Sequence, residues 1–380
     1  MSQNFDVMIL GLNPQGLFLL REFSKAGYKT IGVGLRGQVG LFSKYGKKIA
    51  IKNLKDLHSI FSRYLCDSIN IHISSDPFLN YIVENHNEIF HNYKCFPEFG
   101  PASLFRDKLL TEHFARNLSI PCPYAYKTTE IDPDTYDKFP SIIKWNRAYD
   151  KYPFKTAMIK SKDELIAFSQ KNARNDNLLI QEYIPGEPRA DLSYGGYWID
   201  GIEKIGIVIS QKRQSSSRLA SFVEEYDGEY AQQVKNIAKL LLEKTNYNGF
   251  VEVECRVDDR QKNVYLIEVN PRACGWIKIV REQFDNVLLK SRDDQINLGE
   301  KPLCWVNIAR DCRAILNLYK TSHNKINVKE IITDYLRNPV KDIFEIDDLK
   351  PFAGQFLNFL IKDGSRKKQI TSDSFRINLD

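Results

Sequence analysis

Two neighbouring segments of the sequence, FVEVECRVD and VYLIEVNPR, contain several side chains whose oxygen atoms could bind a metal ion. Both segments alternate apolar and polar residues, which is typical of β-strands, and residues 259–263 form the turn between them. This alternation puts Glu252 and Glu254 on one face of the first strand, and Glu268 and Asn270 on one face of the second. We therefore expect the two strands to present carboxylates and an amide to one spot.

Such a cluster needs cations, because like charges repel each other and raise the pKa of carboxyl groups. Mg²⁺ is a hard ion that takes oxygen ligands and usually completes its octahedron with phosphate oxygens and water, so Glu254, Glu268 and Asn270 fit a magnesium site. The alternatives are a solvent-facing acidic surface or salt bridges to nearby arginines. The complete sequence E-V-N-P-R favours the metal site, since Pro271 ends the strand and Arg272 adds a permanent cation.

The N-terminal elements predict a parallel sheet. Between residues 5 and 75, strand-like runs such as FDVMILGL and KTIGVGL alternate with amphipathic stretches, the rhythm of βαβ units. Residues 11–16 (GLNPQG) resemble a dinucleotide-binding turn that lacks its second glycine, and no acidic residue closes the next strand. We therefore favour a Rossmann-like scaffold over a working NAD site.

Further along the chain, the patterns predict mixed helices and strands. RDKLLTEHFARNL and EYAQQVKNIAKLLLEKTN have helical periodicity, and SKDELIAFSQKN has Ser161 as its N-cap with Glu164 in the capping-box position. FPSIIKWN, NLLIQEYIPGEP and IEKIGIVISQKR indicate strands. Residues from about 320 to 380 are predicted to be helical and then polar.

Composition narrows the class of protein. A chain of 380 residues, with 43% hydrophobic and 27% charged residues, predicts a globular protein of two or three domains. The net charge of +6 is spread along the chain, which argues against nucleic-acid binding, and no apolar run reaches membrane-spanning length. The seven scattered cysteines predict reduced thiols. We expect a cytoplasmic protein, with a homodimer as one possible assembly.

With these motifs in place, the chain resembles the ATP-grasp superfamily, most closely the carboxylate-amine ligases related to carbamoyl-phosphate synthase and D-aspartate ligase. The resemblance runs from about residue 5 to 320. It implies an α/β and α+β fold in three parts: a Rossmann-like pre-ATP-grasp domain (1–95), a two-lobed ATP-grasp domain (96–320, small lobe about 122–185) and a C-terminal helical extension (321–380). It also implies ATP and Mg²⁺ as cofactors, and a small-molecule carboxylate and amine as substrates.

The resemblance further implies a phosphate site. Lys108 belongs to the Asp-Lys pair that opens the ATP-grasp domain and is followed by SIPCP, which is similar to the GIPVP of the family. Lys144 matches the second nucleotide lysine, although a tryptophan follows it where the family has proline. The mobile loop is normally glycine-rich, but residues 145–154 contain no glycine, and Lys155 is a candidate to reach in from there. A surface lysine is the alternative interpretation of Lys144.

The remaining site residues also come from the resemblance. Glu187 or Asp191 is placed to bind the ribose hydroxyls, and Arg272 to contact the transferring phosphoryl group or the acyl phosphate. Lys212 or Arg213 resembles a basic position near the same phosphates. The adenine hinge corresponds to Gln181, Glu182, Tyr183 and Ile184, and the magnesium ligands to Glu254, Glu268 and Asn270.

The function expected from the sequence is an ADP-forming carbon–nitrogen ligase that activates a carboxylate as an acyl phosphate and couples it to an amine. Two alternatives stay open. One is an ATP-binding regulatory protein that has lost catalysis, and the other is an NAD-dependent oxidoreductase, which would leave the cluster from 254 to 272 unexplained.

Overall fold

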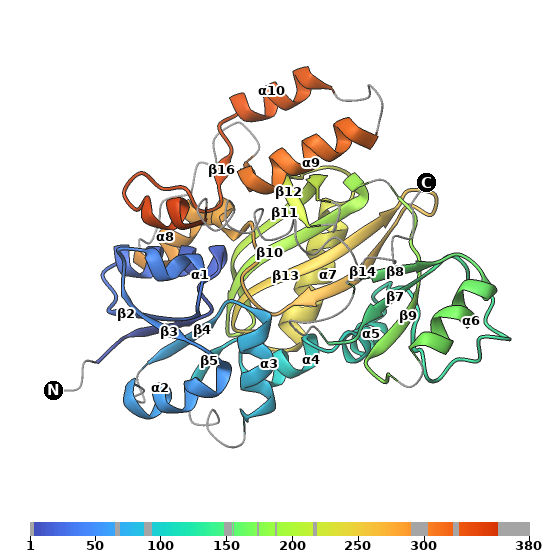
Figure 1. Ribbon diagram of the computed structural model, residues 1–380, viewed down its shortest axis with the longest axis horizontal. Helices are drawn as coiled ribbons and strands as arrows, with labels where there is room; N and C mark the ends of the chain where they lie inside the picture. The colour runs from blue at the N-terminus through green and yellow to red at the C-terminus, as the bar shows by residue number, and fades with distance from the viewer. Residues whose placement is uncertain are drawn as a thin grey trace, which may run out of the picture.

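Three β-sheets follow one another along the chain (Figure 1). The structure is a computed structural model that describes residues 4–64, 69–86, 93–147, 154, 156–172, 175–186, 188–215, 219–289, 303–321 and 327–355. Within these residues, no helix combines the length and the apolar character that crossing a membrane requires.

The first sheet is parallel and has the strand order β3-β2-β1-β4-β5, which confirms the expected βαβ pattern. Its core consists of aliphatic and aromatic side chains from the strands and from the helices that cover them. The elements are β1 (Val7–Leu10), α1 (Pro14–Lys25), β2 (Thr30–Leu35), β3 (Lys47–Ile51), α2 (Leu57–Tyr64), β4 (Asn70–Ile73), α3 (Asp76–Glu84) and β5 (Lys94–Phe96).

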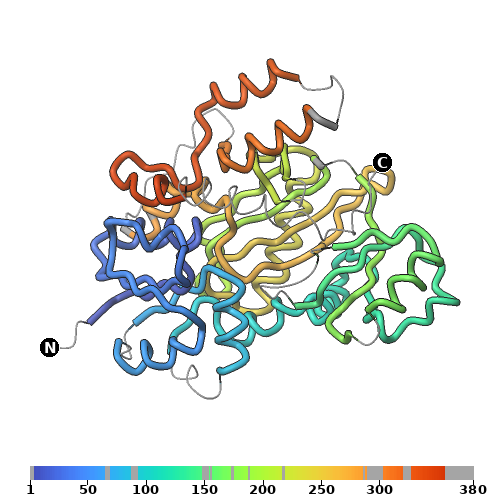
Figure 2. Tube along the Cα trace, in the orientation of Figure 1, coloured from blue at the N-terminus to red at the C-terminus, as the bar shows by residue number. Residues whose placement is uncertain are grey.

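A small antiparallel sheet with the order β6-β9-β7-β8 follows after two helices, and Figure 2 shows it as the teal-to-green projection beside the large sheet. Ile143 and Ile180 on one face of this sheet pack with Leu165 of α6. The Ser161 side chain caps α6 as expected, because it accepts a hydrogen bond from the Glu164 amide. The elements are α4 (Phe99–Phe105), α5 (Lys108–Asn117), β6 (Ala125–Lys127), β7 (Ser141–Trp145), β8 (Thr156–Ile159), α6 (Lys162–Lys171) and β9 (Leu178–Glu182).

The central sheet has seven strands in the order β14-β13-β10-β11-β12-β15-β16. All pairs are antiparallel except β15 with β16. Its elements are β10 (Asp191–Ile199), β11 (Ile202–Gln214), β12 (Ala220–Glu225), α7 (Ala231–Lys244), β13 (Gly249–Asp258), β14 (Asn263–Asn270), α8 (Arg281–Leu289), β15 (Cys304–Val306), α9 (Ile308–Thr321), α10 (Val328–Leu336) and β16 (Val340–Lys341).

The two faces of strand β13 meet different surroundings. Val251, Val253 and Cys255 lie in the core that includes α7, whereas Phe250 belongs to a separate core shared with α1 and Trp276. Because successive side chains on a strand point to opposite faces, Glu252 and Glu254 lie on the face away from α7. This is the division of faces that the alternating sequence predicts.

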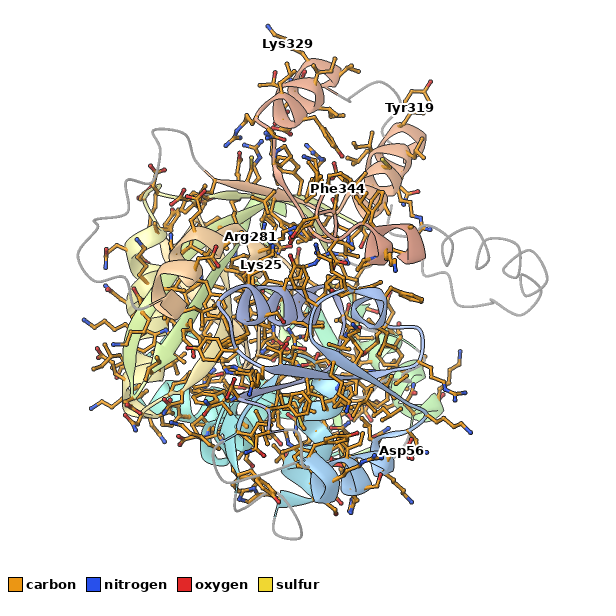
Figure 3. The ribbon with its side chains drawn as sticks, turned by 90° about the vertical axis from the view of Figure 1, so that its left-hand side faces the viewer. Lys25, Asp56, Arg281, Tyr319, Lys329 and Phe344 are labelled. Atoms are coloured by element: carbon orange, nitrogen blue, oxygen red, sulfur yellow. The ribbon has the colours of Figure 1, made fainter. Side chains whose placement is uncertain are left out.

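The C-terminal segment folds back onto the first domain. Arg21 of α1 is fully buried and forms ion pairs with Asp348 at 3.0 Å and with Glu345 at 3.2 Å. Arg281 also pairs with Glu345, and Figure 3 shows Lys25, Arg281 and Phe344 close together where this segment meets α1. The region after residue 320 therefore connects the first domain to the central sheet, because it adds a strand to that sheet and forms ion pairs with α1.

Candidate functional site

Strands β13 and β14 bring the predicted carboxylates and amide together. Glu252 lies opposite Asn270 in the antiparallel register, and Glu254 lies opposite Glu268. The Asn270 Nδ2 donates to Glu254 Oε1 at 2.8 Å and to Glu252 Oε2 at 3.2 Å. The indole of Trp276 donates to the other oxygen of Glu252 at 2.8 Å. Glu252 is thus held behind the cluster, and burial raises the pKa of its carboxyl group.

The metal role of this cluster stays a prediction. Across the part of the chain that the structure describes, no three His, Cys, Asp or Glu side chains form a cluster that could hold a metal ion. The expected set of Glu254, Glu268 and Asn270 contains two carboxylates and one amide. Such a set suits an ion that takes its other ligands from phosphate and water.

Two lysines from different elements approach the same carboxylates. Lys108 is the first residue of α5, whose N-cap Asp107 accepts a hydrogen bond from the Leu110 amide at 3.0 Å. The Lys108 ammonium forms an ion pair with Glu268 at 2.9 Å. Lys144 comes from β7, and its side chain lies on the sheet face opposite Ile143, which faces α6.

Lys144 is the most unusual cation of the site. Only 7% of the residue is exposed, and among the described residues its ammonium group has no hydrogen-bond partner. The pKa of Lys144 is lowered from 10.5 to about 8, mainly by burial and also by the neighbouring charge of Lys108, although the carboxylates of Glu268 and Glu254 act in the opposite direction. The alternative interpretation of Lys144 as a surface lysine is therefore wrong. A buried, unsatisfied cation of this kind calls for an anion.

A cavity of about 590 Å³ opens in front of the cluster, within the size range of small-molecule sites. Lys108, Lys144, Glu254, Glu268 and Asn270 line it. It therefore joins groups from α5, the small sheet and the central sheet.

Arg272 also lines the cavity, where the first domain meets the central sheet. Its guanidinium binds Asp76 at the start of α3 in a two-pronged contact of 2.5 and 2.9 Å. Burial alone would lower the pKa of Arg272, but the Asp76 carboxylate outweighs it and raises the pKa. This ion pair ties the first domain to the end of β14 and fixes the position of the guanidinium.

The predicted adenine hinge covers the end of β9 and the two residues after it. A neighbouring arginine binds the last of these residues. Arg256 donates to the carbonyl oxygens of Ile184 and Gly186 and forms an ion pair with Asp191. Gln214 donates to the second Asp191 oxygen at 3.0 Å, so ribose hydroxyls would compete for this carboxylate.

The other predicted hinge residues lie at the junction of the lobes. Gln181 is buried and borders a narrow gap shared with Lys108 and Glu268. The Glu182 amide donates to the Tyr124 carbonyl oxygen at 2.9 Å, and Tyr183 directly follows β9 as a half-buried residue. Lys155, Glu187 and most of the glycine-free loop lie outside the described residues.

The structure does not bring Lys212 or Arg213 to the cavity. Lys212 binds Asp334 at 2.6 Å, while Arg213 is buried and pairs with Asp311 at 2.9 Å and with Asp334. An irregularity in β11 explains why Arg213 faces away from the cavity. Gln211 lies opposite Val223, but Arg213, two residues later, lies opposite Phe222, only one residue further along the partner strand.

This β-bulge turns the strand over, so that Gln211 lines the cavity while Arg213 packs on the other face against the Phe222 ring. We therefore correct the sequence-based assignment of a phosphate contact to Lys212 or Arg213, since Lys212 binds a carboxylate of α10 and Arg213 binds carboxylates of α9 and α10.

Several cavity residues escaped the sequence-based prediction. Asp76 and Gln15 come from the first domain, and their participation depends on how the domains meet. Gln211 sits beside the predicted Lys212, and alternation along β11 puts these two side chains on opposite faces. Trp305 and Arg310 also line the cavity, and nothing in their local sequence marks them.

The N-terminal turn is not arranged for a pyrophosphate. Gln38 Oε1 accepts hydrogen bonds from the amides of Leu12 and Leu35 at 2.7 and 3.1 Å. The Leu12 carbonyl oxygen accepts from the Gly40 amide at 2.8 Å. The amide and the carbonyl oxygen of Leu12 therefore already have partners within the protein.

Free cysteines agree with the sequence-based expectation for the described residues. Cys95, Cys122, Cys255, Cys274 and Cys304 are buried and unpaired, and Cys312 is exposed. Cys66 lies outside the described residues.

Comparison with known proteins identifies the fold. No protein-family model matches the chain, and no curated protein matches it in sequence. By structure it is similar to an N5-carboxyaminoimidazole synthase of Aspergillus clavatus solved with ADP and an aminoimidazole ribonucleotide, with 14% identity, a TM-score of 0.62, and coverage of 81% of this chain and 83% of that one. It is also similar to the N5-carboxyaminoimidazole synthetase of Staphylococcus aureus, with 15% identity, a TM-score of 0.63, and coverage of 86% and 88%.

A third similar structure belongs to a different enzyme. Pyruvate carboxylase of Rhizobium etli shares 13% identity at a TM-score of 0.57, over 75% of this chain and 27% of that one. The chain shares the fold of these enzymes, which confirms the α/β and α+β fold class expected from the sequence. Because the same fold occurs in different enzymes, the chemistry must be argued from the site.

Proposed function

We propose that this chain is an ADP-forming, Mg-ATP-dependent ligase that activates a carboxylate as an acyl phosphate and couples it to an amine. One observation carries the proposal: the buried Lys144 ammonium has no partner among the described residues and shares a cavity with Lys108, Glu254, Glu268 and Asn270. Two lysines and an oxygen-ligand cluster in one cavity suit a triphosphate with its metal ion.

The residues present fit both groups. Lys144 and Lys108 hold the triphosphate, which supplies the anion that the buried Lys144 lacks. Glu254, Glu268 and Asn270 would hold Mg²⁺, and Glu268 also forms an ion pair with Lys108. When bound, the ion neutralises charge on the phosphate oxygens. The hinge of Gln181 to Ile184 remains the proposed adenine site.

The chemistry follows from what a carboxylate lacks. A carboxylate has no good leaving group, so one of its oxygens first attacks the γ-phosphorus of ATP, and the bond from that phosphorus to the ADP oxygen breaks. The amine nitrogen then attacks the acyl carbon, phosphate leaves with the carbon–oxygen bond electrons, and the nitrogen loses a proton.

The protein contributes mainly in-line positioning and charge compensation to these steps. Arg272, held by Asp76, is placed at the cavity wall to bind the phosphoryl group or the acyl phosphate.

The ligands of two structural neighbours support nucleotide binding, since Aspergillus clavatus enzymes of this fold were solved with ADP and with ATP. A regulatory protein that binds ATP without turnover is the second candidate, because the cavity alone does not reveal the acid or the amine. The satisfied turn at Leu12 disfavours a nicotinamide enzyme. A cytoplasmic location and a homodimer remain sequence-based proposals.

The proposal is tested by measuring ADP release from Mg-ATP with pooled carboxylates and amines. We expect substrate-dependent ADP and phosphate, and a loss of about 100-fold or more in Glu268→Gln, because the neutral amide is a weaker ligand for a hard divalent ion. AMP and pyrophosphate as products would overturn the mechanism, and nucleotide binding without any turnover would favour the regulatory protein.

A matched control is Glu243→Gln. Glu243 is an exposed residue of α7 that pairs with Lys239 one turn earlier, so the substitution changes the same charge far from the cavity. It should leave the rate of ADP release unchanged. Equal losses in both variants would mean that the Glu268 effect comes from net charge rather than from the site.

A further inference from the structure

One wall of the cavity comes from residues 305–310, which run from β15 into the first turn of α9. Trp305 of β15 and Arg310 of α9 both line the cavity from this segment. Asn307 anchors it, since its amide donates to the Ser221 carbonyl oxygen at 2.9 Å and its side chain accepts from the Arg310 amide at 2.8 Å. The segment is therefore a fixed part of the central sheet and holds both side chains in place.

Arg310 differs from the other inward-facing arginines of the protein. Arg21, Arg213, Arg256 and Arg272 each form an ion pair with an aspartate. The Arg310 guanidinium instead donates to the Ala220 carbonyl oxygen, and among the described residues no carboxylate lies within 4.0 Å of it. Burial lowers the pKa of Arg310, and the more distant Asp342 compensates only in part. A half-buried arginine without a counter-ion is prepared for an anion.

Trp305 gives a second, independent sign of a ligand. The residue is only 2% exposed, and its indole Nε1 has no hydrogen-bond partner among the described residues. The indole of Trp276 in the same cavity, by contrast, donates to Glu252. Gln211 lies opposite Val223, which in turn lies opposite Trp305, so these residues form one row across the sheet on the cavity side. A buried donor without an acceptor destabilises the protein, and an incoming acceptor would remove that cost.

We propose that this wall binds an anionic oxygen group, a carboxylate or a phosphate, of the ligase's organic substrate, with Arg310 as its counter-ion and the Trp305 indole as a further donor. This inference rests on the proposed function for its assignment to a substrate. The triphosphate is served by Lys108 and Lys144 on α5 and β7, whereas Arg310 belongs to α9, so the two anion sites come from different elements. The organic substrate is therefore expected to carry an anionic oxygen group that the Arg310 wall recognises.

Direct binding measurements test the proposal. Succinate and glycerol 3-phosphate serve as anionic probes, and 1,4-butanediol and glycerol as their neutral counterparts, each titrated by calorimetry against the full chain. We expect at least one anionic probe to bind, and to bind about 10- to 100-fold more weakly to Arg310→Gln, since a charge-assisted hydrogen bond is lost. Arg310→Lys should recover part of the affinity, and the better probe distinguishes a carboxylate from a phosphate.

Arg313→Gln is the matched control, because Arg313 is an exposed residue of the same helix and loses the same charge. Its probe affinity should equal that of the wild type, and thermal unfolding should show that all variants are folded. The proposal is overturned if no anionic probe binds the wild type, if the neutral probes bind equally well, or if Arg310→Gln keeps full affinity. Titration of the wild type with Mg-ADP distinguishes the proposed function from the proposed anion site. If Mg-ADP does not bind, the proposed function is refuted. Arg310-dependent anion binding would still support this wall as a site.

Discussion

The substitution Lys144→Met tests the central physical argument, because it removes the buried charge and keeps an unbranched side chain of similar length. In the absence of nucleotide, Lys144 is buried without a partner among the described residues, and its pKa falls from 10.5 to about 8. Each pKa unit corresponds to ~1.4 kcal/mol, so keeping this lysine protonated destabilises the nucleotide-free protein by about 3 kcal/mol at pH 7.

The sign of this effect depends on pH. Below pH 8 the lysine is protonated in both the folded and the unfolded chain, and the full destabilisation is present. As pH rises through about 8, the folded protein releases the proton first, and the destabilisation fades until the unfolded lysine is also neutral near pH 10.5. Lys144→Met should therefore be more stable than the wild type at pH 7, and this advantage should disappear toward pH 10.5.

Nucleotide affinity should change in the opposite direction. Loss of one charge-assisted hydrogen bond to phosphate predicts about 10- to 100-fold weaker binding of Mg-ADP. Thermal unfolding without nucleotide at pH 7 and pH 10, together with calorimetric titration of Mg-ADP, measures both effects. Lys160→Met is the control, since Lys160 is an exposed residue just after β8. The reasoning is refuted if Lys144→Met is less stable than the wild type at pH 7, or if it binds Mg-ADP equally well.

Two further substitutions examine buried ion pairs outside the phosphate site. Arg213→Met leaves Asp311 and Asp334 without their shared cation. It should therefore lower the free energy of unfolding by about 3–5 kcal/mol in denaturant titrations, while the affinity for Mg-ADP stays unchanged. Weaker Mg-ADP binding with unchanged stability would instead support a phosphate contact of Arg213. Asp348→Asn leaves the buried Arg21 with Glu345 alone and should destabilise the chain by about 3 kcal/mol. An unchanged thermal midpoint would show that residues after 340 do not fasten the first domain.

Much of the fold could be predicted because its signals are local. The helix after Ser161 begins where the capping pattern places it, and the strand carrying Lys144 follows from its short apolar run. Alternation alone puts Glu268 and Asn270 on one face of their strand, but the β-bulge between Glu254 and Cys255 brings that face to the side of Glu254. The assignment of Arg213 failed because alternation assumes an unbroken strand, and a single extra residue in β11 reverses which side chains face the cavity.

The sequence by itself determined which residues share a face within β13 and within β14, since side-chain direction along a regular strand depends only on the parity of the residue number. Only the tertiary structure decided what meets that face. Arg272 binds Asp76, which lies 196 residues earlier, and Arg310 reaches the cavity without a carboxylate beside it among the described residues. Such contacts depend on how separate elements pack, and no local pattern in the chain encodes them.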